Sequence, residues 1–192
     1  GYACARELAA LGADVLLVAR DELVLQEVRD ELADECPDVE VLGMAADLAD
    51  HEDRLAVFDW VADLGMNLSM LVNNVGGNTP KATVDYEDDE YRALFELNVF
   101  SAFEMSRAAH PHLVQHAHAA IVNVGSVSGI THVRTGSPYG MTKAALIHQT
   151  SSGYPRAVNN LALQALVAAF AADKAIVDES STRTAIAEVT AD

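Results

Sequence analysis

Two hydrophobic patterns alternate along the chain, and this alternation limits the fold more than any other feature. Short, continuous apolar runs predict strands, and the longer amphipathic stretches between them predict helices. The expected strands cover residues 15–18, 39–45, 68–72 and 119–124, and the expected helices cover 2–11, 22–35, 50–64, 88–115 and a segment from Pro138. Strands separated by helices of this length join through βαβ crossovers, so we expect a parallel sheet in an α/β fold.

The first helix and the first strand carry specific expectations about burial. The helix over 2–11 is expected to place Ala3, Leu8 and Leu11 on its apolar side and to stop at Gly12. The apolar run 15–18 is typical of a strand that is buried on both faces.

The composition is that of one ordinary globular domain. The chain has 192 residues, of which 51% are apolar and 21% charged. Its net charge of −17 argues against nucleic acid and anionic membranes as partners, because both attract a basic surface. A solvated, soluble surface accounts for the acidity, and a halophile surface or repulsion between subunits is the alternative.

Cysteine usage and the chain start bear on the compartment. Cys4 and Cys36 are the only cysteines, which is too few for a disulfide framework and fits a reducing cytosol. No apolar run reaches the roughly 18–20 residues that span a bilayer, and no signal-peptide pattern opens the chain. We therefore expect a cytoplasmic protein. Because the chain opens without Met in a segment that already reads as helix, we expect it to begin inside a longer gene product.

Polar and glycine-containing segments follow the expected strands. They are Arg20-Asp21, Asp47, the loop from Asn73 to Gly77, and Gly125-Ser126. Because parallel sheets bind ligands beyond the carboxyl ends of their strands, these segments form the expected binding edge. Two glycines in the loop allow close approach of a ligand, although an ordinary turn would also explain them.

Tyr139 and Lys143 are the first candidates for catalysis. At a spacing of i and i+4 on a helix they share one face, so both can point into one cleft. A free tyrosine has a pKa near 10, and a neighbouring cation favours the phenolate and lowers that pKa. The pair alone is a weak signal, because such a spacing also arises by chance.

Ser126 strengthens the interpretation. It lies just past the strand 119–124, thirteen residues before Tyr139. A hydroxyl there can donate to a carbonyl oxygen and stabilise developing negative charge. Ordinary turn chemistry is the alternative, and spacing alone does not exclude Ser128 in the same role.

These residues together resemble one family. Asn73-Asn74-Val75-Gly76, Asn98 in the 88–115 helix, Ser126, and Tyr139 with Lys143 are similar in order and spacing to the short-chain dehydrogenase/reductase family. Gly1-Tyr2-Ala3 and Val127-Ser128-Gly129 look most like its tropinone-reductase-like branch. The resemblance covers residues 1–150. It implies a Rossmann-like, doubly wound parallel sheet with helices on both faces, and hydride transfer between NAD(P) and a carbonyl or alcohol carbon.

The resemblance also implies a role for each catalytic residue. Tyr139 would be the general acid in reduction, and Lys143 would lower its pKa and hold the nicotinamide ribose. Ser126 would orient the substrate oxygen, and Asn98 would support a water relay to Lys143. A helical Asn can simply face solvent, but the apolar neighbours of Asn98 favour a buried, partnered side chain.

Cofactor choice is read at the end of the strand 15–18. An acidic residue there would accept the ribose 2′-hydroxyl, whereas this chain has Ala19-Arg20, whose guanidinium can pair with a 2′-phosphate. We therefore expect NADP rather than NAD, although Arg20 could instead pair with Asp21 or Glu22. The expected cofactor-binding residues are Gly1, Arg20, Asp47, Leu48, Asn73, Val75, Gly76, Tyr139 and Lys143. For Asp47 a helix cap is an equally good explanation.

The chain departs from the family pattern at both ends. The family's first strand and its glycine-rich loop would precede the opening helix, and only the last glycine, Gly1, is present. From about Ser151 the sequence lacks the family's Pro-Gly loop, and an Ala/Leu-rich stretch predicts a mainly helical tail over 151–192, after a catalytic domain over 1–150. A catalytically incompetent relic or interaction protein with the same fold is therefore the alternative to an enzyme.

Two further expectations concern metals and partners. His110, His112, His116 and His118 lack a carboxylate or cysteine that would complete a site, so we expect solvated histidines and no metal. The expected substrate is a small carbonyl or alcohol compound. We also expect a homodimer or homotetramer that forms through the 88–115 helix.

Overall fold

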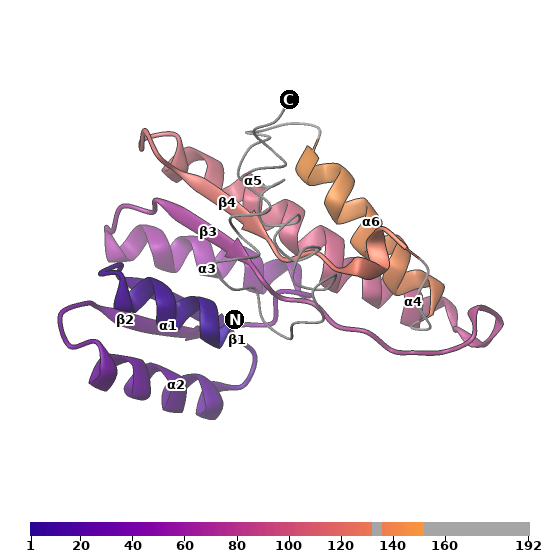
Figure 1. The fold of residues 1–192 in the computed structure, drawn as a ribbon, viewed down its shortest axis with the longest axis horizontal. Helices are drawn as coiled ribbons and strands as arrows, with labels where there is room; N and C mark the ends of the chain where they lie inside the picture. Colours follow the sequence, from indigo (N-terminus) through magenta and orange to yellow (C-terminus); the bar gives the residue numbers. More distant parts are fainter. Residues whose placement is uncertain (132–135, 152–192) are drawn as a thin grey trace. The chain divides into compact units, whose positions relative to one another are not determined.

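The computed structural model describes residues 1–131 and 136–151, which fall into two compact units, Gly1–Met66 and Asn67–Asp192. Figure 1 shows the helices and strands of both units. The expected tail over 152–192 lies outside the described residues, so the proposed division at residue 150 stays a prediction.

The first unit contains a parallel pair of strands covered by helices. Strands β1 (Val15–Ala19) and β2 (Val41–Ala45) pair in register from Val15↔Val41 to Ala19↔Ala45. Helices α1 (Tyr2–Ala10) and α2 (Glu22–Glu35) pack on these strands and on each other. The core consists of Ala5, Ala9, Val15, Leu32 and Val41. Helix α3 (His51–Leu64) ends at Gly65, which adopts a left-handed conformation.

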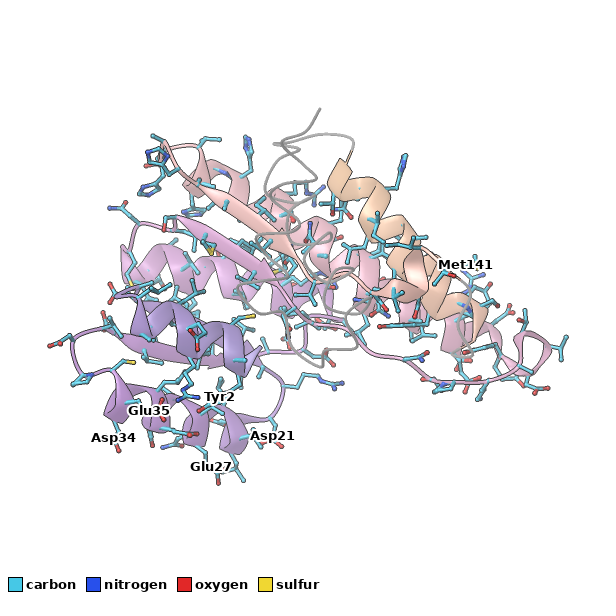
Figure 2. All side chains as sticks on the ribbon, in the orientation of Figure 1. Tyr2, Asp21, Glu27, Asp34, Glu35 and Met141 are labelled. Carbon is cyan, nitrogen blue, oxygen red and sulfur yellow. The ribbon has the colours of Figure 1, made fainter. Side chains whose placement is uncertain are left out.

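Polar contacts join α1 to α2 at the surface. The Tyr2 hydroxyl donates to Glu31 and the Arg6 guanidinium donates to Glu35, each at 2.9 Å. Other carboxylates of α2, including Glu27 and Asp34, are exposed and extend away from the strands (Figure 2). Much of the negative charge on α2 is therefore solvated.

The buried side of α1 differs from the expected one. Ala5 and Ala9 are buried and Leu8 packs beside them, whereas Ala3 is exposed and Leu11 is 83% exposed. The helix ends at Ala10, so the side chain of Leu11 lies past the last turn. The expectation was right for Leu8 and wrong for Ala3 and Leu11.

The second unit contains another parallel pair. Strands β3 (Met70–Asn73) and β4 (Ala120–Asn123) pair from Met70↔Ala120 to Asn73↔Asn123. Helix α5 (Ser101–Leu113) packs on both strands. Helix α6 (Ser137–Ser151) packs on α4 (Asp88–Phe95), on a π-helical turn (η2, Glu96–Phe100) and on a short 3₁₀ turn (η3, Val127–Gly129).

The sheets and the long helix correct two expectations. Of β1 only Val15 is buried, and its other four residues are partly exposed, so the strand is not buried on both faces as expected. The expected single helix over 88–115 contains the π-turn Glu96–Phe100 and ends at Leu113. None of the helices in the described residues is long and apolar enough to cross a membrane.

Candidate functional site

Helix α6 carries the Tyr139–Lys143 pair. The Lys143 side chain is only 4% exposed, and its Nζ lies 5.9 Å from the centre of the Tyr139 ring. The ammonium donates to the Val124 carbonyl at 3.1 Å, just past the end of β4. Burial lowers the pKa of Lys143, because desolvation penalises its charged form. The pair therefore shares one side of α6, as the i, i+4 spacing predicts.

The serine loop packs closely against the same helix. A Cβ on Gly129 would lie 2.6 Å from the Lys143 backbone carbon, and one on Gly140 would lie 3.0 Å from the Ser128 carbonyl oxygen. Both glycines therefore allow the loop and α6 to approach closely. Ser126 donates to Ser128 through its hydroxyl at 3.1 Å and accepts the Ser128 N–H at 3.2 Å. Because the two hydroxyls touch, the choice between them stays open.

Asn98 lies in the π-turn and is 1% exposed. Its Oδ1 accepts the Gly77 N–H at 3.0 Å, and its Nδ2 donates to the carbonyls of Gly77 and Leu94, each at 2.9 Å. The expectation of a buried, partnered Asn is confirmed. Its amide holds the backbone of the loop that follows β3.

Gly76 brings the loop beside Asn98 and Lys143. A Cβ on Gly76 would lie 2.8 Å from Asn98 Oδ1 and 3.1 Å from Lys143 Nζ. Only glycine leaves this space open. Four of the expected residues, from three separate parts of the sequence, thus meet in the second unit: Gly76, Asn98, Tyr139 and Lys143.

The remaining loop residues differ in what they offer a ligand. The Asn73 amide is committed to the interior, since its Nδ2 donates to Asn123 Oδ1 at 2.8 Å and to Ser106 Oγ at 3.0 Å. Val75 is half-buried. The cofactor role of Asn73 and Val75 stays a prediction.

The first unit holds the other expected cofactor residues. Arg20 is exposed directly after β1, and Asp47 and Leu48 follow β2; because β1 and β2 are parallel, all three lie at one edge of that sheet. The Asp47 carboxylate accepts the Ala49 N–H at 3.0 Å, and Leu48 is buried. Gly1 is exposed and its carbonyl accepts the Ala5 N–H.

Arg20 is available for a phosphate in this arrangement. The Asp21 carboxylate, one of the two expected competitors beside Glu22, accepts the N–H groups of Leu23 and Val24 and caps α2. Within the described residues, Arg20 forms none of the recorded ion pairs.

Sequence reasoning missed the residues that support these positions. Arg54 of α3 is buried and donates to the Leu48 carbonyl at 2.7 Å, and Asp53 accepts the Asp47 N–H at 2.7 Å. Asn123 and Thr150 hydrogen-bond to each other at 3.0 Å in the second unit. An Asn at the end of an apolar strand was the available signal for Asn123, whereas nothing in the sequence marks Thr150.

The described part of the chain contains no group of three or more His, Cys, Asp or Glu side chains that could hold a metal ion. Cys4 and Cys36 are both free thiols.

Sequence comparison gives one family model, described as short chain dehydrogenase, that matches residues 1–156. Among curated proteins, Senescence-associated protein 13 of Arabidopsis thaliana is 37% identical over 147 residues, covering 76% of this chain and 54% of its own length. A tropinone reductase homolog of the same plant is 38% identical over 147 residues, covering 76% and 55%. The chain thus spans about half the length of the curated relatives it matches.

Solved structures are similar over the same region. L-sorbose reductase from Gluconobacter frateurii, complexed with NADPH and L-sorbose, has a TM-score of 0.76 and 29% identity over 79% of this chain and 57% of its own. A short-chain dehydrogenase from Sphingobium yanoikuyae in complex with NADPH has a TM-score of 0.70 and 32% identity over 78% and 57%. These similarities confirm the expected Rossmann-like α/β fold.

Proposed function

We propose that this chain, which belongs to the short-chain dehydrogenase family, carries the catalytic centre of an oxidoreductase that transfers hydride between NADP(H) and a ketone or secondary alcohol. Its similarity to the tropinone reductase homologs confirms the expected branch. The observation that supports the activity best is the buried Lys143, whose ammonium lies beside both the Tyr139 ring and Gly76.

Tyr139 is the proposed general acid. In reduction its hydroxyl proton passes to the carbonyl oxygen of the substrate, and the phenolate that remains is stabilised by the Lys143 ammonium. A hydroxyl of the Ser126–Ser128 pair donates to the same substrate oxygen and holds it in place. Asn98 acts by fixing Gly77, and through it the shape of the space beside Lys143.

The chain has residues that fit NADP(H). Gly76 leaves room beside Lys143 that a Cβ would fill, and Arg20 offers an exposed guanidinium with the geometry that pairs with phosphate. NADPH in the solved complexes of related enzymes agrees with this choice. When bound, the dinucleotide supplies the hydride.

The test is carbonyl reduction by the 192-residue chain. NADPH oxidation is followed with tropinone and L-sorbose as probes, since related proteins are named for these compounds. We expect turnover that Tyr139→Phe lowers at least 100-fold, in the range for general acid catalysis. If Tyr139→Phe turned over as fast as wild type, Tyr139 would not be the general acid. If the wild-type chain folded cooperatively but showed neither turnover nor dinucleotide binding, the result would favour a catalytically incompetent relic with the same fold.

We also propose self-association through η2 and α5, within the expected 88–115 helix. Phe100 of η2 and Phe103 of α5 are 45% and 47% exposed, so this helical segment presents two aromatic side chains at its surface. Their exposure supports a homodimer or homotetramer formed by this face.

A further inference from the structure

The two strands of the second unit end in paired asparagines. Asn73 and Asn123 are in register, and Asn73 Nδ2 donates to Asn123 Oδ1 at 2.8 Å. Asn123 Nδ2 in turn donates to Thr150 Oγ1 at 3.0 Å, and the Thr150 hydroxyl donates to the Leu146 carbonyl at 2.7 Å. All these hydrogen bonds run in one direction, from β3 through β4 into α6.

Within the residues that the structure describes, the hydrogen bonds given above attach α6 to the end of β4 at two points, and this chain of hydrogen bonds is the second. The first is the hydrogen bond from Lys143 Nζ to the Val124 carbonyl, one residue after Asn123. Thr150 follows Lys143 by seven residues, which is about two helical turns, so both side chains face β4 from points about 10.5 Å apart along the axis. Together with the packing of α6 on α4, η2 and η3, two separated attachments oppose both rotation and sliding of the helix on β4.

We propose that Asn123 and Thr150 are positioning residues that fix the rotation of α6 on β4 and thereby hold Lys143, together with Tyr139 on the same helix, beside Gly76. The catalytic consequence rests on the proposed function, because displacement of a catalytic group by about 1 Å can cost roughly 100-fold in rate. The effect on the position of Lys143 concerns the folded chain alone and does not depend on the proposed function.

A second branch of the same network provides a matched control. Asn73 Nδ2 also donates to Ser106 Oγ at 3.0 Å, and the Ser106 hydroxyl donates to the Ala102 carbonyl at 2.6 Å. Ser106→Ala and Thr150→Val each remove one hydroxyl that accepts an Asn amide and donates four residues back along its helix. Ser106 lies on α5, so its loss leaves the attachment of α6 in place.

The experiment reads Lys143 directly by NMR of lysine labelled with ¹³C at Cε. The chain has three lysines, Lys81, Lys143 and Lys174, so Lys143→Arg assigns the signal. A Tyr139→Phe background removes the neighbouring phenol from the titration. We expect Thr150→Val to move the pKa of Lys143 back toward its ordinary value, because a small rotation of the helix on β4 would expose the ammonium to water. Ser106→Ala and the conservative Thr150→Ser should leave that pKa unchanged.

An unchanged Lys143 titration in Thr150→Val, or an equal change in Ser106→Ala, would overturn the proposal. If Thr150→Val does not fold, Thr150→Ala is titrated instead under the same criteria. Because the NMR readout needs neither cofactor nor turnover, it separates the two proposals. If Thr150→Val shifts the pKa of Lys143 but the wild-type chain reduces no ketone, the positioning role stands and the proposed function is rejected.

Discussion

Gly76 determines how closely the loop after β3 approaches Lys143. In Gly76→Ala the new Cβ would lie 2.8 Å from Asn98 Oδ1, closer than such atoms normally come, so the loop or the amide must move. We expect a loss of about 1–3 kcal/mol in the free energy of unfolding, measured by urea denaturation. The same variant should weaken NADPH binding.

Gly65→Ala is the control, because it replaces a glycine by alanine without a steric clash. Gly65 has φ +63°, and a Cβ there would meet nothing within 4 Å, so only backbone strain of roughly 1–2 kcal/mol is expected. It should leave NADPH affinity unchanged. If Gly76→Ala had the stability and the NADPH affinity of wild type, the loop would be able to accommodate a Cβ at this position.

Lys143 should make stability depend on pH in a specific direction. Burial lowers its pKa, so between the lowered value and about 10.4 the unfolded chain binds more protons than the folded chain. The free energy of unfolding therefore rises with pH in that window, and the cost of burying the charge is complete below it. We expect the free energy of unfolding of wild type, minus that of Lys143→Met, to increase as pH rises toward about 10.4, measured by urea unfolding. A constant difference would mean that the folded chain does not perturb this group.

Some site residues follow from local rules and others do not. The i, i+4 rule predicts that Tyr139 and Lys143 share a face, and apolar neighbours predict the burial of Asn98. The contact of Gly76 with Lys143 joins positions 67 residues apart, and only the assembled sheet edge brings them together. The role of Thr150 could not be predicted from local sequence either, because its partner Asn123 lies on another element.

At the scale of elements, the π-turn places Asn98 at the site. The amphipathic pattern over 88–115 correctly predicts continuous helical structure, but periodicity does not report a single widened turn. This turn aims the Asn98 amide at both backbone groups of Gly77. The strand and helix positions themselves were predictable to within two residues in most cases, because apolar runs, Asp caps and glycine stops mark them.

Replacing Asn98 tests this element. Asn98→Leu leaves the Gly77 N–H and C=O without their amide partner, so we expect a loss of roughly 2–4 kcal/mol in the free energy of unfolding. Hydrogen exchange of the Gly77 amide should accelerate. Asn78→Leu, at an exposed position in the same loop, should change stability by no more than about 0.5 kcal/mol. Equal losses in the two variants would argue against a special role for the π-turn.

At the scale of the whole molecule, the exposed aromatics of η2 and α5 test self-association. Phe103→Glu places a charge in the proposed face, where burial of an unpaired carboxylate is costly. We expect light scattering after gel filtration to give a dimer or tetramer for wild type and a monomer for Phe103→Glu. Val84→Glu, at a position that is 90% exposed outside those helices, should keep the wild-type mass. A monomeric wild type would reject the proposal.

The fold class was predictable from the alternation of apolar runs and amphipathic helices, because parallel strands need helical crossovers. The separation into two compact units was not predictable, because a local sequence pattern does not report how many contacts join neighbouring segments. The unit that begins at Asn67 holds Tyr139 and Lys143, and the first holds Arg20.

Dinucleotide binding tests the central claim most directly, with fluorescence of Trp60, the single tryptophan, as the signal. We predict saturable binding of NADPH, weaker binding of NADH, and a loss of about 10- to 100-fold in NADPH affinity in Arg20→Glu, because a charged hydrogen bond contributes roughly 1.5–3 kcal/mol. A cooperatively folded 192-residue chain that binds neither NADPH nor NADH would contradict the account.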